Sequence, residues 1–172
     1  MMKTSKPTLY IFAGLPGSGK STLAKRLAEK TGAAYFRIDT IEQGLKDVCK
    51  MDKVEGEGYR LTYLVVKDNL RAGNNVISDS VNPWELSRDE WNEVATSVNC
   101  NFVDIEVCCS NETEHKNRLE IRDTGIKNLK KTTWEDVINR DYHPWTRPRI
   151  QIDTASKSID NSFVELLNKL NL

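Results

Sequence analysis

The sequence predicts an α/β fold, a three-layer α/β/α sandwich built on a five-stranded parallel sheet. The predicted strands are five short apolar segments rich in β-branched or aromatic residues: Leu9–Ala13, Ala34–Ile38, Asn75–Asp79, Phe102–Cys108 and Arg149–Ile152. Their apolar character is nearly continuous rather than alternating, and stretches with helical character separate them. Strands of this kind are buried on both faces of a parallel sheet, so we expect helices on both sides.

Helix start signals lie between these strands. Asn82 followed by Pro83 is typical of an N-cap and first helical position, ahead of a helix to about Val98. Thr132–Glu135 has the spacing of a capping box. A C-terminal helix is expected from about Lys157 to dock an apolar stripe on the sheet. Its apolar positions at helical spacing are Ile159, Phe163, Leu166, Leu167 and Leu170.

The length of 172 residues fits one domain, which can bury about two thirds of its unfolded surface. We therefore expect residues 1–172 to form a single domain, with a mobile acceptor-side segment at about 44–60 and a lid at about 122–132. The first segment alternates charges, and the second combines Gly125 with basic residues and lacks apolar periodicity. Ordinary solvated loops are the alternative for both.

Charge and apolar runs restrict the partners. The 25 basic residues balance 25 acidic ones and the pI is about 6.7, so no global field attracts nucleic acid or an anionic membrane. Residues 1–7 are polar, and no run approaches the ~18 apolar residues of a membrane span. We expect a cytoplasmic protein without a membrane partner.

The cysteines have no zinc-binding spacing; they are Cys49, Cys100, Cys108 and Cys109.

A phosphate-binding loop occupies Gly14–Ser21, with the sequence Gly-Leu-Pro-Gly-Ser-Gly-Lys-Ser. Glycines let backbone N–H groups approach the phosphates of a nucleotide, Lys20 neutralises the β/γ charge, and Ser21 supplies a hydroxyl to Mg²⁺. A buried-strand segment precedes the loop and an amphipathic helix follows it. The expected nucleotide-binding residues in this motif are Leu15, Pro16, Gly17, Ser18, Gly19, Lys20, Ser21 and Thr22.

Three classes of protein use such a loop: small-molecule kinases, mechanical ATPases and GTP switches. A mechanical ATPase would end an apolar strand in Asp-Glu, but here Ser80 follows Asp79. A GTP switch would carry an Asn-Lys-x-Asp motif, and the pair Asn168-Lys169 is not followed by that aspartate. The kinase class remains.

A kinase needs an acidic group near the acceptor hydroxyl and guanidinium groups that stabilise transition-state charge. Asp39 follows the second strand, where α/β sheets bind ligands, and is the candidate base. The alternative is structural, because Asp39 and Glu42 also have the spacing of a capping box.

Two arginines and a second aspartate complete the expected site. Arg118 and Arg122 are four residues apart in the helical stretch Glu112–Asp123 and are expected to face the same way. One would stack on the adenine and the other would reach the phosphates; a solvated helix face is the alternative. Asp79 is expected to bind Mg²⁺ through water, together with Ser21, or to brace an arginine.

Four motifs carry a family resemblance: the loop at 14–22, Arg-Ile-Asp at 37–39, Ile-Ser-Asp at 77–79 and Arg-Leu-Glu-Ile-Arg at 118–122. Over nearly the whole chain the sequence resembles the bacterial AAA_33 group of P-loop kinases, which is similar to phage polynucleotide kinase and to chloramphenicol phosphotransferase. The resemblance implies that Asp39 is the acceptor-side base, that both arginines belong to a lid, and that residues 153–155 lie beside the adenine.

The sequence departs from polynucleotide kinases at Glu42, where those enzymes carry an arginine that grips the acceptor's phosphate. A neutral or cationic hydroxyl compound is therefore favoured as acceptor, and Trp134, Tyr142 and Trp145 are candidates to shape its pocket, although core packing is the commoner role of tryptophan.

We therefore expect a phosphotransferase that moves the γ-phosphoryl group of ATP, with Mg²⁺, to a hydroxyl of a small molecule, using Lys20, Asp39 and Arg122. The alternatives are a nucleic-acid 5′-hydroxyl kinase, which is less favoured, and a nucleotide-binding regulatory ATPase.

Overall fold

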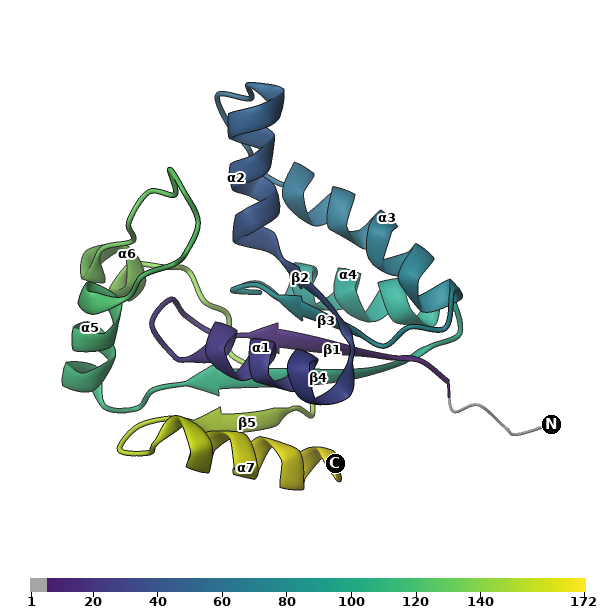
Figure 1. Cartoon of the computed structure of the whole chain (residues 1–172). Coiled ribbons are helices and arrows are strands. Elements are labelled where there is room, and N and C mark those ends of the chain that lie inside the picture. The colour runs from purple at the N-terminus through teal and green to yellow at the C-terminus, as the bar shows by residue number, and fades with distance from the viewer. Residues whose placement is uncertain (1–5) are drawn as a thin grey trace.

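The computed structural model describes residues 6–172 and contains one five-stranded sheet (Figure 1). All strand pairs are parallel, and the strand order is β2-β3-β1-β4-β5. The strands are β1 (Thr8–Ala13), β2 (Ala34–Arg37), β3 (Val76–Asp79), β4 (Asn101–Cys108) and β5 (Ile150–Asp153). The predicted parallel α/β/α fold is confirmed, and each predicted strand overlaps an observed one.

Helices cover both faces of this sheet. They are α1 (Lys20–Thr31), α2 (Ile38–Cys49), α3 (Glu57–Arg71), α4 (Glu85–Thr96), α5 (Glu112–Ile121), α6 (Trp134–Ile138) and α7 (Ile159–Leu170). Helices α1 and α7 pack on one face, and α3 and α4 pack on the other. Helix α2 rises away from the sheet and packs against α3, while α5 and α6 lie beyond the end of the strands (Figure 1).

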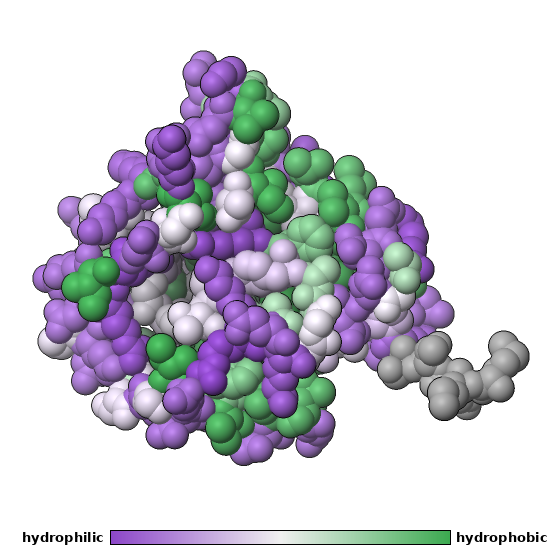
Figure 2. Space-filling model, in the orientation of Figure 1, coloured by the Kyte–Doolittle hydropathy of each residue, from purple (hydrophilic) through white to green (hydrophobic). Residues whose placement is uncertain are grey.

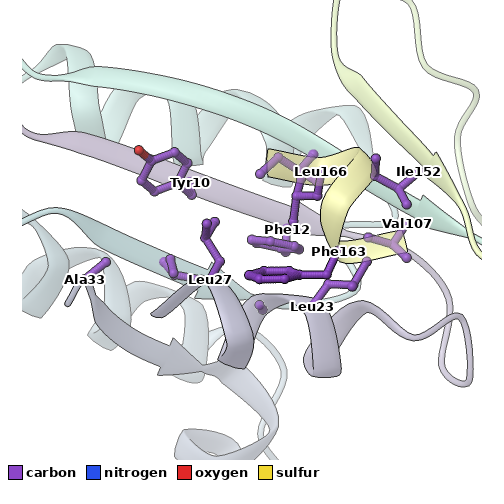
Figure 3. Packing of buried hydrophobic residues seen from close by; sticks show 12 residues of the cluster. Tyr10, Phe12, Leu23, Leu27, Ala33, Val107, Ile152, Phe163 and Leu166 are labelled. Carbon is purple, nitrogen blue, oxygen red and sulfur yellow. The ribbon is translucent and has the colours of Figure 1, made fainter. Parts of the chain in front are cut away.

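The central strand β1 divides the core in two because its side chains alternate between the faces. Leu9 and Ile11 enter the cluster beneath α3 and α4, whereas Tyr10 and Phe12 enter the cluster beneath α1 and α7. Figure 3 shows this second cluster, in which Phe163 of α7 points toward Phe12. A strand buried on both faces needs the continuous apolar sequence that predicted it.

Two predicted helix starts are wrong. Asn82 does not cap α4; it has a φ of 47°, and its side chain donates to the Phe12 carbonyl oxygen at 2.9 Å. The helix starts at Glu85 and has no side-chain cap. The capping box before α6 is formed by Thr133 and Asp136, one residue later than predicted.

The two segments expected to be mobile differ in structure. Most of the segment 44–60 is helical, since residues 44–49 end α2, residues 57–60 begin α3, and only residues 50–56 connect them. Residues 122–132 contain no helix or strand. In the part of the chain from residue 6 onward, no helix is long and apolar enough to cross a membrane.

Candidate functional site

The phosphate-binding loop leaves β1 at the centre of the sheet, where β3 and β4 flank it on opposite sides. Its glycines have the positive φ angles that L-residues rarely adopt, 141° at Gly14, 88° at Gly17 and 94° at Gly19. A Cβ on Gly14 would lie 2.1 Å from the Val107 carbonyl oxygen. The loop therefore needs glycine both for its backbone angles and for its close approach to β4.

Two buried side chains hold this loop from outside. His115 of α5 places Nε2 2.8 Å from the carbonyl oxygen of Pro16, and its ring packs edge-on against Trp134. Thr154, directly after β5, places Oγ1 2.8 Å from the Ser18 carbonyl oxygen. His115 lies 99 residues from Pro16 in the chain, so the sequence offered no local signal for this contact.

Lys20 and Asp79 form a buried ion pair between the loop and the end of β3. The Lys20 ammonium donates to Asp79 Oδ1 at 2.6 Å, and the Tyr35 hydroxyl donates to Asp79 Oδ2 at 2.6 Å. Burial acts to raise the pKa of Asp79, but the charge of Lys20 and hydrogen bonds that include the Ser21 hydroxyl outweigh it and lower the pKa. Asp79 is therefore a carboxylate fixed beside the phosphate-binding loop.

The residues expected at the metal fit Mg²⁺ in chemistry, since a serine hydroxyl and a carboxylate both present the oxygen ligands it prefers. Ser21 opens α1 directly after Lys20. Both oxygens of Asp79 accept hydrogen bonds, one from Lys20 and one from Tyr35, and contact with Mg²⁺ through water stays a prediction for Asp79.

Asp39 is the second residue of α2 rather than the last of a strand, because β2 ends at Arg37 and the helix begins at Ile38. Arg37 occupies the N-cap position, and no side chain caps the helix, so the capping alternative for Asp39 is wrong. The Asp39 carboxylate is 38% exposed and accepts from Arg37 Nη2 at 3.4 Å.

Arg37 was not among the residues predicted for the site. Its side chain is only 9% exposed, and Nη1 donates to the carbonyl oxygen of Thr124 at 2.7 Å. Its Nε lies 4.0 Å from Asp79 Oδ2. Arg37 thus joins three parts of the site: Asp39, the Asp79 carboxylate and the segment 122–132.

The two predicted arginines lie at different parts of the site. Arg118 donates to Oγ1 of Thr154 at 2.8 Å and to its carbonyl oxygen at 3.1 Å, and it pairs with Glu114. Arg122 lies beyond the end of α5 with an extended backbone, so the expectation of a shared helix face is wrong. Burial lowers its pKa, and the Asp39 carboxylate acts against that shift.

A cavity of about 950 Å³ connects these groups. Figure 2 shows hydrophilic side chains around a hollow between α2 and α5. The phosphate-binding loop residues Leu15 to Thr22, Asp39, Arg118 and Arg122 line the cavity. Acidic groups on the side toward α3 and α4 include Glu42 and Glu90.

The three aromatic residues considered for the acceptor pocket do not line this cavity, so that expectation is wrong. Trp134 packs on His115. Tyr142 and Trp145 pack on the buried guanidinium of Arg88, whose Cζ lies 4.1 Å from the centre of the Trp145 ring. They fix the segment before β5 against α4.

Comparison with known proteins shows that the chain is similar to kinases. The family model AAA_33, described as an AAA domain, matches residues 9–140. An adenylyl-sulfate kinase of Prochlorococcus marinus is 31% identical over 96% of this chain and 84% of its own length. A putative adenylate kinase of Pyrococcus furiosus is 29% identical over 76% of this chain and 80% of its own length.

The fold is shared with solved kinase structures. The APS kinase CysC of Mycobacterium tuberculosis, solved in complex with AMPPNP and APS, superposes with a TM-score of 0.69 at 18% identity, over 98% of this chain and 99% of that chain. The predicted P-loop kinase fold and the predicted AAA_33 resemblance are both confirmed.

Proposed function

The chain belongs to the AAA_33 family and its relatives are kinases, and from this premise we propose that it transfers the γ-phosphoryl group of ATP to a hydroxyl of a small molecule. The relatives divide by acceptor. An adenylate kinase, by its name, phosphorylates a nucleotide, whereas an adenylyl-sulfate kinase acts on adenylyl sulfate. The acceptor side of the cavity must therefore decide the class.

On the donor side, the loop backbone and Lys20 hold the β- and γ-phosphates. Arg118 lies beside Thr154 at the rim and is placed to cover the adenine. Mg²⁺, held by Ser21 and through water by Asp79, would neutralise charge on the phosphate oxygens. Arg122 approaches from the lid segment and stabilises charge on the transferred group.

The position of the Asp39 carboxylate is the main reason to propose a hydroxyl acceptor. It lines the cavity and does not cap its helix. A hydroxyl acceptor must lose a proton as it attacks phosphorus, and a carboxylate within reach can take that proton. An acceptor phosphate is already anionic, so it needs no base, and a carboxylate at that position would repel it.

A phosphate acceptor is the second candidate, because two kinds of relatives are nucleotide kinases and exposed cations also reach the cavity. On the acceptor side these exposed cations are Arg60, Lys130 and Arg140, whereas Arg37 and Arg122, which also line the cavity, lie near the Asp39 carboxylate. Arg60, Lys130 and Arg140 are solvent-exposed at the rim of the cavity, where a charge interacts more weakly with a bound acceptor than a partly buried carboxylate does.

Phosphorus NMR of the reaction products separates these candidates. The protein is incubated with ATP and Mg²⁺ and with sugars, polyols, amino alcohols, AMP, CMP or a 5′-hydroxyl oligonucleotide. The proposal expects a phosphomonoester on a small hydroxyl compound. If only AMP or CMP is phosphorylated, giving a new phosphoanhydride, the proposal is contradicted. If only the 5′ ends of the oligonucleotide are phosphorylated, the acceptor is a nucleic acid. ATP hydrolysis that no acceptor stimulates would favour a regulatory ATPase.

A further inference from the structure

Glu90 on the acceptor side accepts a hydrogen bond from Tyr63, whereas Glu42 has no role in the donor site or as the proposed base. It lies one helical turn after Asp39 on α2 and lines the same cavity. Across residues 6–172, no lysine, arginine or histidine nitrogen lies within 4.0 Å of its carboxylate. The carboxylate of Glu42 is partly buried without a counter-ion.

The neighbouring helix is shaped around this side chain. A Cβ added to Gly58, in the first turn of α3, would lie 2.3 Å from Glu42 Cγ. Gly58 has no positive φ angle, and glycine inside a helix is less stable than alanine. Glycine at this position therefore makes room for Glu42, which packs between α2 and α3.

The charges around Glu42 do not neutralise the negative charge of its carboxylate. Burial and the neighbouring Asp39 raise its pKa to about 7, and Glu57 adds to the shift. Lys46 and Arg140 act in the opposite direction, but both are exposed. A cation entering the cavity would relieve this repulsion.

A tyrosine ring lies in the same part of the cavity as the carboxylate. Tyr59 lines the cavity and directly follows Gly58, the residue that makes room for Glu42. Its ring packs edge-on against Tyr63, whose hydroxyl donates to Glu90 Oε2 at 3.1 Å. A carboxylate and a tyrosine ring that line one cavity can together bind an ammonium group.

We propose that the acceptor is an amino alcohol or amino sugar, whose protonated amine lies between the Glu42 carboxylate and the Tyr59 ring while its hydroxyl faces Asp39. This inference rests on the proposed function. Residues one turn apart on a helix have Cβ atoms roughly 5–6 Å apart, which favours acceptors whose amine and hydroxyl lie on neighbouring or next-neighbouring carbons. The hydroxyl oxygen forms a bond to the γ-phosphorus, the bond to the β–γ bridging oxygen breaks, Asp39 accepts the proton and ADP leaves.

The test compares acceptors in which an amine replaces a hydroxyl. The pairs are serinol with glycerol, ethanolamine with ethylene glycol, and glucosamine with glucose. We expect kcat/KM to be at least about 10-fold higher for the amino member of a pair, and Glu42→Gln to remove most of that preference through KM, as the loss of one charge-assisted contact predicts. Glu93→Gln, an exposed charge change on α4 outside the cavity, should leave the preference unchanged.

Loss of fold does not explain the expected result, because the amide keeps the shape of the side chain and removes an uncompensated charge. Melting temperatures check this point and should not fall. Equal efficiency within every pair, or an unchanged preference in Glu42→Gln, overturns the inference while phosphorylation of glycerol or glucose leaves the proposed function standing. Phosphorylation of no member of any pair, with AMP or CMP accepted, overturns both.

Discussion

The Lys20 ammonium donates to the Asp79 carboxylate at 2.6 Å, and both side chains are buried. This pair ties the phosphate-binding loop to the end of β3, the strand beside β1. Asp79 therefore positions Lys20, the residue proposed to bind the nucleotide phosphates, and anchors the loop at the same time.

This pair predicts a non-additive effect on stability. Lys20→Ala leaves a buried carboxylate without its cation, and breaking a buried pair in this way costs about 3–5 kcal/mol. Adding Asp79→Asn removes the stranded charge and should recover part of the loss. Urea unfolding of the two single variants and the double variant measures the coupling, while phosphoryl transfer should be lost whenever Lys20 is absent. Additive changes in unfolding free energy would mean that the two residues are independent.

The two arginines should affect different kinetic parameters. Arg118 contacts Thr154 at the rim of the cavity, where we propose that the adenine binds, so Arg118→Ala is expected to raise the KM for ATP with a smaller effect on kcat. Arg122 lies nearer Asp39, so Arg122→Ala should lower kcat by roughly 10²-fold or more if it stabilises the transferred group. Steady-state kinetics with ATP varied distinguishes the two effects. The assignment is contradicted if both variants change only the KM for ATP.

Gly14 should tolerate no side chain. Gly14→Ala combines a positive φ of 141° with a Cβ only 2.1 Å from the Val107 carbonyl oxygen, so we expect a loss of stability larger than the ~1 kcal/mol typical of Gly/Ala changes. Gly44→Ala is the matched control, since Gly44 lies in α2 with nothing within 4 Å of an added Cβ. It should gain about 0.5–1 kcal/mol. Thermal melts that rank the two variants in the opposite order would refute this reading of the loop.

Glu42 should make the protein less stable as pH rises from about 4.5 to about 7. Burial is the chief cause that raises the pKa of Glu42 from an ordinary 4.5 to about 7. Between these pH values the folded state binds more protons than the unfolded state, so the free energy of unfolding falls as pH increases. Partial exposure limits the effect to on the order of 1 kcal/mol. Urea unfolding between pH 4.5 and 7.5 should show wild type losing stability relative to Glu42→Gln, and parallel pH profiles would contradict the prediction.

Patterns that lie within a few neighbouring residues predicted the fold and the phosphate-binding loop. Buried strands such as β1 are recognised by their own composition, and the loop at Gly14 requires its glycines locally. Hydropathy could not locate the start of α2, because Ile38 is buried like a strand residue although the chain has already turned into a helix. This one-residue difference decides that Asp39 is free to face the cavity.

Contacts between distant residues were not predictable in this way. His115 supports Pro16 across 99 residues, and an isolated histidine carries no pattern. The alternation of β2 does place Tyr35 and Arg37 on the same face, and both reach Asp79. That strand periodicity was the available signal for Arg37, whereas the end of α5 before Arg122 depends on how the lid segment packs.

The most direct test of the central claim is single-turnover transfer from ATP to a hydroxyl acceptor by Asp39→Asn. We expect a transfer rate lower by about 10²–10⁴-fold, with ATP affinity and melting temperature nearly unchanged, because Asp39 does not cap α2. Transfer at the wild-type rate would contradict the assignment of Asp39 as the acceptor base.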